Sequence, residues 1–340
     1  MVRIEGEEGR VRRVVTKTTE YDADLVIMAA GVRPNVDIAR DAGLEIGETG
    51  ALAVNEFMQT SDPDIYAGGD LVQNRHLASG RACFAPLGST ANKHGRVIGD
   101  NVCGGASRFA GISGTFICKV FYFNAGATGL TEAKAAAAGL DFYTANASGM
   151  DIAHYYQGAQ AMAQKLVIER GTDRVLGYQA IGGGDTARRI DVVATAIRFG
   201  ATIDQLADLD LAYAPPYAQA VDCLLHAANA ARNKRDGVMK GISPAEARAL
   251  LQADKAAVID VRGEMEYKRM RLPARRSYNI PVDDLPARVA ELPRDLPLIA
   301  VCTVGLRGYA AQKTLDAAGF ADVRVLEGGL FQWPWKDELQ

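Results

Sequence analysis

The chain has 340 residues, which is enough for two or three domains of ordinary size. Its hydrophobic fraction of 48% and its charged fraction of 23% are typical of a globular protein. The net charge of −3 argues against binding to nucleic acid or anionic membranes, and no apolar run approaches the roughly 20 residues that cross a bilayer. The five cysteines contain no CxxC pair, which argues against a disulfide framework and a metal site and favours a reduced, cytoplasmic protein.

The N-terminal elements have the pattern of a domain interior. We predict a hairpin over residues 2–17 and a buried parallel strand over residues 24–30 (DLVIMAA), a continuous apolar run. A parallel strand needs neighbouring strands, and the residues before this run are too few to supply them. We therefore expect the gene to begin inside a domain. Three further elements are predicted: a helix over residues 36–42, a strand over residues 64–69 that ends at Asp70, and a helix over residues 89–102.

An α+β layer is predicted next, and it is distinct from the segment before it. Thr131 is placed to cap the start of a helix, and Gly200 is placed to end the helix over residues 185–199 in the left-handed conformation. The predicted strands are residues 115–123, 165–170 and 175–181.

The last part of the chain has the pattern of a compact α/β domain. Residues 233–241 are polar with two glycines and are predicted to be a linker. Ser243, Pro244 and Glu246 then form a capping box, which predicts the start of a helix. Strands that alternate with helices are predicted over residues 256–261, 298–301 and 323–326.

A candidate nucleophile stands in this domain, between an apolar strand and an amphipathic helix over residues 309–318. A loop in this position turns backbone N–H groups toward the Cys302 sulfur at the positive end of the helix dipole, which stabilises a thiolate. Gly305 permits the tight turn, and Arg307 adds a fixed cation. The alternative is a buried structural cysteine, which this spacing disfavours. The predicted catalytic residues are Cys302 and Arg307, and the predicted cradle loop is Thr303, Val304, Gly305 and Leu306.

The same domain resembles the rhodanese family along its whole length. The resemblance rests on residues 259–262 (IDVR), 266–267 (EY), 279–281 (NIP) and 327–329 (EGG) followed by Trp333. It implies sulfur transfer through a persulfide on Cys302. The loop from Cys302 to Arg307 is one residue shorter than that of the related phosphatases, which favours sulfur over phosphate. Two departures lower the expected catalytic efficiency: residues 270–275 (MRLPAR) replace the usual GHIPGA, and Gly308 replaces a serine.

The first part of the chain resembles the pyridine nucleotide-disulfide reductases. Residues 60–70 (TSDPDIYAGGD) are similar to their second FAD segment, and residues 86–96 (PLGSTANKHGR) to the helix that faces the flavin ring. A carboxylate at the end of a strand can accept hydrogen bonds from ribityl hydroxyls, although an acidic turn residue is the alternative. The resemblance implies FAD contacts at Gly69, Asp70, Pro86, Leu87 and Ala91.

Within that family, residues 213–217 (YAPPY) resemble the dimerisation domain of coenzyme A-disulfide reductases and NADH oxidases. The resemblance implies a homodimer, a small thiol or persulfide substrate such as coenzyme A, and a thiol site approached by Tyr213 and by Tyr155 or Tyr156. The N-terminal GxGxxG, the redox cysteine beside it and the NAD(P)H fingerprint of these enzymes are not found in the sequence.

The predicted fold is therefore α/β and α+β multidomain. We expect an FAD-dependent NAD(P)H oxidoreductase acting on coenzyme A disulfide, persulfide or polysulfide, without its N-terminal half, fused to a sulfurtransferase. Reductase activity would then require a missing N-terminal chain. Two alternatives are an NADH oxidase or peroxidase fragment and a non-catalytic dimerising scaffold. The expected domains are an NAD(P)-binding remnant (1–32), an FAD-binding segment (33–110), a dimerisation domain (111–232), a linker (233–241) and a rhodanese-like domain (242–340).

Overall fold

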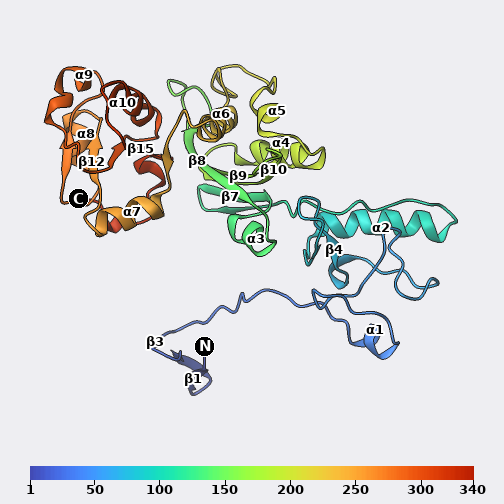
Figure 1. The fold of residues 1–340 in the computed structure, drawn as a ribbon. Helices are drawn as coiled ribbons and strands as arrows, with labels where there is room; N and C mark the ends of the chain where they lie inside the picture. Colours follow the sequence, from blue (N-terminus) through green and yellow to red (C-terminus); the bar gives the residue numbers. More distant parts are fainter. The chain divides into compact units, whose positions relative to one another are not determined.

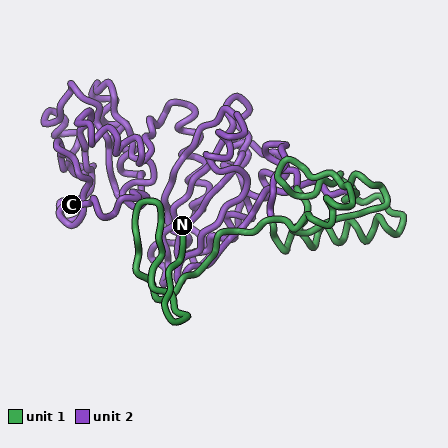
Figure 2. The backbone as a smooth tube through the Cα atoms, turned by 90° about the horizontal axis from the view of Figure 1, so that it is seen from below, with its two compact units in different colours: residues 1–73, 86–107 green, residues 74–85, 108–340 purple.

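The computed structural model describes residues 1–340 and divides them into two compact units. The first unit contains residues 1–73 and 86–107, and the second contains residues 74–85 and 108–340 (Figure 2). None of the helices combines the length and the apolar character that a membrane span requires.

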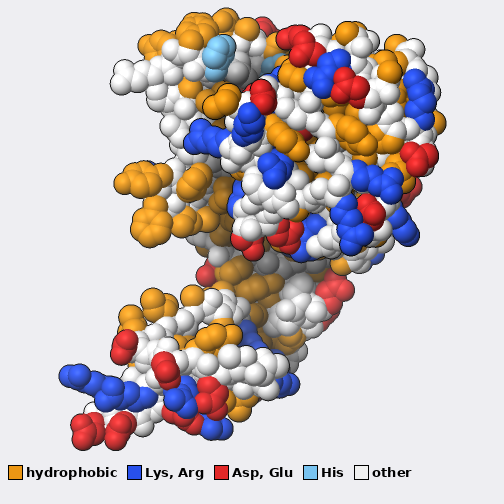
Figure 3. Space-filling model, turned by 90° about the vertical axis from the view of Figure 1, so that its left-hand side faces the viewer, with side chains coloured by type: hydrophobic (Ala, Val, Ile, Leu, Met, Phe, Trp, Pro, Cys, Tyr) orange, Lys and Arg blue, Asp and Glu red, His pale blue; other side chains and the backbone are white.

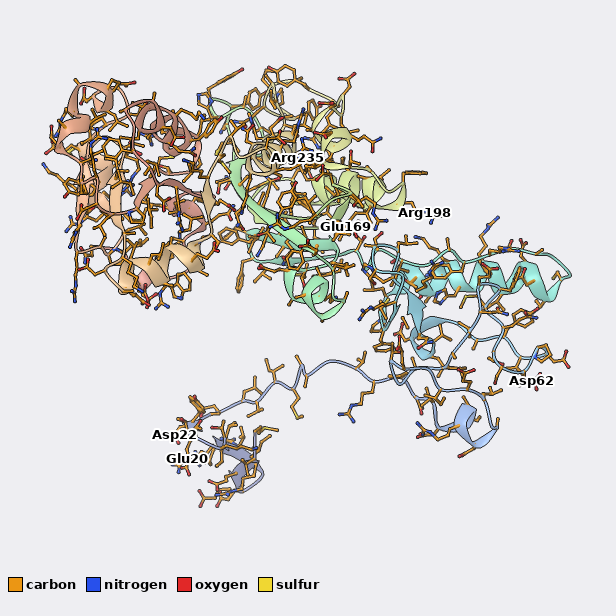
Figure 4. The ribbon with its side chains drawn as sticks, in the orientation of Figure 1. Glu20, Asp22, Asp62, Glu169, Arg198 and Arg235 are labelled. Carbon is orange, nitrogen blue, oxygen red and sulfur yellow. The ribbon has the colours of Figure 1, made fainter.

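The first unit begins with the predicted hairpin, which the structure confirms as part of an antiparallel sheet of order β1-β2-β3. Arg13 on β2 donates hydrogen bonds to Glu20 and Asp22 on β3, both of which are labelled in Figure 4. The elements of this unit are β1 (Arg3–Glu7), β2 (Arg10–Val15), β3 (Glu20–Asp22), α1 (Asp37–Asp41), the 3₁₀ turn η1 (Gly69–Leu71) and α2 (Gly88–Val102).

Two strands predicted in this unit are wrong. Residues 24–30 pair with no strand, and Leu25, Ile27 and Met28 are 75%, 81% and 71% exposed. An apolar run indicates a segment that can be buried between neighbours, but the run does not itself provide those neighbours. Residues 64–69 form a single β-bridge, at Tyr66, and Asp70 lies in the 3₁₀ turn η1 rather than at the end of a strand.

The second unit begins with an antiparallel sheet of order β6-β7-β10-β9-β8 and a short β4–β5 pair (Figure 1). The single strand predicted over residues 115–123 is in fact two strands, because the chain turns at Phe121 and Tyr122. The strands are β4 (Asn74–Arg75), β5 (Ala82–Cys83), β6 (Phe116–Val120), β7 (Phe123–Gly129), β8 (Phe142–Met150), β9 (Ala161–Glu169) and β10 (Val175–Gly182). The helices are α3 (Glu132–Ala137), α4 (Thr186–Arg198), α5 (Ile203–Ala207) and α6 (Cys223–Arg235).

The core of this layer lies between the sheet and the helices α4 and α6. Leu166 of β9, Tyr178 of β10 and Ile190 of α4 pack in one buried cluster. The predicted helix cap is confirmed, because the Thr131 side chain accepts a hydrogen bond from the backbone N–H of Lys134. The pairing of β9 with β10 and the helix α4 are also confirmed.

The C-terminal part of the second unit is a parallel sheet of order β11-β15-β14-β12-β13. Both faces are buried: Ile259 and Ala300 pack in one apolar cluster, and their neighbours Val258 and Ile299 pack in the other. The elements are β11 (Gly241–Ile242), α7 (Pro244–Gln252), β12 (Ala257–Asp260), α8 (Glu264–Arg269), β13 (Ser277–Asn279), α9 (Leu285–Arg288), η2 (Val289–Glu291), β14 (Leu298–Val301), α10 (Leu306–Ala317), β15 (Val323–Leu326), η3 (Leu330–Gln332) and η4 (Lys336–Glu338).

The start of this domain agrees with the sequence in one respect and differs in another. The capping box is confirmed, because Ser243 and Glu246 exchange both hydrogen bonds at the start of α7. The segment predicted to be a linker is helical in its first residues, since α6 continues to Arg235. In the folded protein Lys234 pairs with Glu327, and Arg235 pairs with Asp204. These ion pairs stabilise the helical conformation of residues 233–235.

Candidate persulfide site

Cys302 follows the last residue of β14, the middle strand of the parallel sheet, and its side chain is buried. The backbone N–H of Gly305 donates a hydrogen bond to Cys302 Sγ at 3.0 Å. Gly305 has a φ of +111°, a backbone conformation that residues with a side chain rarely adopt. Helix α10 begins at the next residue, and no side chain caps its start. The sulfur therefore lies beside the start of α10, where unpaired N–H groups favour a negative charge.

Arg307 does not point freely at the sulfur in this structure. Its guanidinium donates to both carboxylate oxygens of Glu266, each at 2.8 Å, and the Thr303 hydroxyl donates to the same carboxylate at 3.1 Å. The Arg307 hydrogen bonds lower the pKa of Glu266 to about 2, so this carboxylate stays ionised. Glu266 was missing from the predicted site, and only its place in the EY motif could have indicated it.

The turn after β15 donates backbone hydrogen bonds to Cys302 and Thr303, the first two residues of the loop. The backbone N–H of Leu330 donates to the Cys302 carbonyl, and that of Phe331 donates to the Thr303 carbonyl, both at 3.0 Å. Gly329 is required here, because a Cβ at this residue would lie 2.6 Å from the Cys302 carbonyl oxygen. Val304 and Leu306 are exposed at the rim of the loop.

Gly308 and residues 270–275, the two departures from the rhodanese pattern, each make specific contacts in the fold. A Cβ on Gly308 would lie 3.1 Å from the carbonyl oxygen of Ala300, so the glycine lets α10 pack tightly on β14. In the turn over residues 270–275, the Met270 carbonyl accepts a hydrogen bond from Arg262, and Leu272 is buried.

The remaining cysteines have different surroundings. Burial raises the pKa of Cys223 to about 12, so it stays protonated. Burial also raises the pKa of Cys83. Cys103 and Cys118 are exposed. Among the five free cysteines, Cys302 is the one that accepts a backbone N–H bond at the start of a helix.

The residues predicted to contact FAD lie in the first unit. The Gly69 N–H donates to His94 Nδ1 of α2 at 3.1 Å, and a Cβ on Gly69 would lie 3.8 Å from Ala91 Cβ. Asp70 is exposed. Helix α2 begins after Pro86 and Leu87 without a side-chain cap, so its first N–H groups are open. Three features here fit the contacts of a nucleotide-type cofactor: Gly69, the uncapped start of α2 and the exposed carboxylate of Asp70.

The predicted tyrosines lie on two exposed loops of the antiparallel layer. Tyr155 and Tyr156 belong to the loop between β8 and β9, and Tyr213 belongs to the loop between α5 and α6. The two loops are joined by a hydrogen bond from the Ala153 N–H to the Pro215 carbonyl at 3.3 Å. The structure therefore brings the two tyrosine-bearing loops into contact.

Comparison with protein families gives three matches along the chain. Residues 1–83 match the pyridine nucleotide-disulphide oxidoreductases, and residues 115–224 match the dimerisation domain of the same family. The chain belongs to the pyridine nucleotide-disulphide oxidoreductase family. Residues 243–334 match the rhodanese-like domain, so the chain also contains a rhodanese-like module. The expected family membership and multidomain α/β and α+β fold are confirmed.

Curated relatives align with about two thirds of the chain. The NAD(P)H coenzyme A polysulfide/persulfide reductase of Pyrococcus horikoshii is 43% identical over 224 residues, which are 66% of this chain and 50% of that protein. An NADH oxidase of Methanocaldococcus jannaschii is 35% identical over 68% of this chain and 51% of its own length. The chain thus spans about half the length of the curated relatives it matches.

Solved structures also resemble the chain. A NAD-dependent persulfide reductase from A. fulgidus is 46% identical with a TM-score of 0.90, covering 97% of this chain and 60% of that one. The reduced CoADR-RHD of Bacillus anthracis is 32% identical with a TM-score of 0.90, covering 99% of this chain and 60% of that one.

Proposed function

We propose that this chain belongs to an FAD-dependent NAD(P)H reductase of coenzyme A persulfides, disulfides or polysulfides, and that its rhodanese-like module carries sulfane sulfur on Cys302. The observation that carries the proposal is the Gly305 N–H bond to Cys302 Sγ at the uncapped start of α10. The Arg307 guanidinium beside it is bonded to Glu266 and would bind an anionic donor that displaces this carboxylate. The reductase part of the proposal is supported by the named activities of the Pyrococcus and A. fulgidus relatives.

The transfer itself needs no cofactor. The Cys302 thiolate attacks the outer sulfur of thiosulfate, the Cys–S bond forms, and sulfite leaves with the electron pair of the broken S–S bond. Cyanide or another nucleophile then takes the outer sulfur of the persulfide, and the electron pair of that bond regenerates the thiolate. In both steps the N–H of Gly305 and the dipole of α10 stabilise the anionic sulfur.

For the reductase, we propose that FAD is held by Gly69, Asp70, Pro86, Leu87 and Ala91. The chemistry that bound FAD would supply is two-electron transfer from NAD(P)H to a disulfide or persulfide. In the chain itself, Asp70 would accept hydrogen bonds from the cofactor, and Gly69 would allow its close approach. Tyr155 and Tyr213 would protonate a departing thiolate at the thiol site.

An NADH oxidase activity is the second candidate, because a relative with that name is 35% identical over 68% of the chain. It would act on oxygen and leave the rhodanese-like module without a role in the reaction. Oxygen consumption with NADH, measured beside sulfide release from a persulfide in the reconstituted enzyme, separates the two activities.

We also propose a homodimer formed through residues 111–232 and a cytoplasmic location. The dimerisation-domain match over residues 115–224 and the exposed aromatic residues of the β6–β7 hairpin support the dimer. Groups of hydrophobic side chains are also visible at the surface in Figure 3. The five free cysteines are consistent with a reducing compartment.

The test is thiocyanate formation from thiosulfate or polysulfide and cyanide by the purified chain. We expect Cys302→Ser to lose the activity completely, since serine cannot form a persulfide. Cys118→Ser should keep it, because that thiol is exposed on strand β6, outside the rhodanese-like module. No thiocyanate from a folded, reduced wild-type chain would refute the role of Cys302.

A further inference from the structure

One buried carboxylate of the rhodanese-like module, that of Glu327, bonds to residues of the preceding domain. The Glu327 side chain is fully buried and accepts three hydrogen bonds, all from outside its own module. Lys234 Nζ at the end of α6 donates at 2.5 Å, and the backbone N–H and Nδ2 of Asn146 on β8 donate at 3.0 Å each. A buried carboxylate is costly unless it is paired in this way, so the contact holds both partners in place.

The residues that follow Glu327 make further contacts with the same domain. We call residues 327–332 the closing turn. The Ser148 hydroxyl of β8 donates to the Gly328 carbonyl at 2.8 Å. The Gln332 side-chain amide donates to the Ala147 carbonyl, and to the Gln164 carbonyl at 3.3 Å. Both ends of the closing turn are therefore bonded to strands β8 and β9.

The closing turn also bonds to the loop that contains Cys302. The N–H groups of Leu330 and Phe331 bond to the carbonyls of Cys302 and Thr303, and Gly329 lies against the same carbonyls with no room for a side chain. A shift of the closing turn would therefore move the backbone of Cys302. Because Gly305 reaches the sulfur through a single hydrogen bond, such a shift changes the geometry of that bond as well.

We propose that Glu327 is a positioning residue for sulfur transfer at Cys302, and that Lys234 and Asn146 make the dimerisation domain a structural part of the sulfurtransferase site. This inference rests on the proposed role of Cys302 as the persulfide carrier. It means that the module does not set the position of its nucleophile by its own residues alone. Lys234 and Asn146 fix Glu327, the first residue of the closing turn, and the closing turn in turn fixes the backbone of Cys302.

The test uses the full chain with Lys234→Met, which removes the charge partner of Glu327 without touching the module. We expect the kcat of thiocyanate formation to fall by about tenfold or more, because small displacements of a reacting group are costly. The KM for thiosulfate should change less, since Arg307 and the loop N–H groups are retained. The alkylation rate of Cys302 by iodoacetamide, followed on its own peptide by mass spectrometry, should change its dependence on pH.

Two variants serve as controls. Lys165→Met is the same substitution in the same compact unit, on strand β9 instead of helix α6, at similar side-chain exposure, 28% against 25%. It removes an ion pair with Glu132 that does not involve the closing turn. It should leave both readouts at the wild-type level. Lys234→Arg keeps the positive charge and should restore most of the kcat.

The outcomes separate this inference from the proposed function. Wild-type kcat and alkylation in Lys234→Met would overturn the inference while leaving the role of Cys302 intact. If the wild type forms no thiocyanate, the proposed function fails, and the alkylation profile alone decides on positioning. If Lys234→Met does not fold, Ser148→Ala decides, because it removes only a hydrogen bond to Gly328. A smaller loss in the same direction supports the inference, and wild-type rates overturn it.

Discussion

At the scale of single residues, the anion site at Cys302 is restrained by an ion pair. Arg307 and Glu266 are bonded through two parallel hydrogen bonds, with side chains 39% and 43% exposed. A dianionic donor must compete with Glu266 for the guanidinium. Because both groups are in contact with solvent, the pair contributes under about 1 kcal/mol to stability.

The Glu266 pair predicts a response to acid. The folded-state pKa of about 2 lies below the ordinary value of 4.5, so the stabilisation is present above about pH 4.5 and is lost as the pH falls toward 2. We expect Glu266→Gln to lower the melting temperature slightly at neutral pH and to match the wild type near pH 2. Thermal melts of both proteins across this range check it, and a difference independent of pH would contradict the assignment.

At the scale of elements, a buried ion pair joins α4 to the start of α6. Arg189 and Asp222 are both buried, and Asp222 also caps α6 by accepting the Leu224 N–H. Arg188 adds bonds to Asp222 and to the Tyr217 carbonyl, which fixes the loop that contains Tyr213. Burial would raise the pKa of Asp222, but the Arg189 hydrogen bonds outweigh it and hold the pKa below its ordinary value.

This pair predicts a large loss of stability in Asp222→Ala. The substitution leaves Arg189 as a buried unpaired charge, and removing one partner of such a pair costs about 3–5 kcal/mol. Asp208→Ala removes an exposed carboxylate bonded to Arg232 and should cost under about 1 kcal/mol. Urea unfolding of the wild type and the two variants measures both losses in the free energy of unfolding. Equal stability of the two variants would show that the buried pair does not hold the loop.

At the scale of the whole molecule, the β6–β7 hairpin presents apolar residues to solvent. Phe121 is 88% exposed and has a positive φ of 51°, which is unfavourable for an aromatic residue. An exposed and strained aromatic side chain is explained by contact with a partner in the proposed homodimer. The exposed large hydrophobic residues of the hairpin are Phe116, Ile117, Val120, Phe121, Tyr122 and Phe123.

We therefore predict that Phe121→Asn weakens the dimer without lowering the stability of the monomer. Asparagine tolerates the left-handed conformation, so backbone strain falls while the apolar contact is lost. Sedimentation at several concentrations should show a higher dimer dissociation constant. Phe199→Asn, at another exposed phenylalanine of the same domain, should leave it unchanged. A wild-type dissociation constant in Phe121→Asn would place the interface elsewhere.

Much of the architecture was predictable because its signals are local. The caps at Thr131 and Ser243 involve residues three positions apart, so the sequence alone displays both partners. The same holds for the apolar run at Val258 and Ile259, which are buried on opposite faces of the sheet. It also holds for the loop from Cys302 to Arg307, in which a strand, a glycine and a helix start are contiguous.

The tertiary structure decided everything that depends on a distant partner. Residues 24–30 have the composition of a buried strand but no strand beside them, so their side chains are exposed. Arg307 is paired with Glu266, 41 positions away, and Glu327 is paired with Asn146, 181 positions away. Neither pairing has a local signature, because a charge in the sequence can bind any opposite group that folding brings near. The sequence by itself therefore indicated the three family domains and the loop of the proposed nucleophile, whereas folding determined which charged residues lie beside that loop.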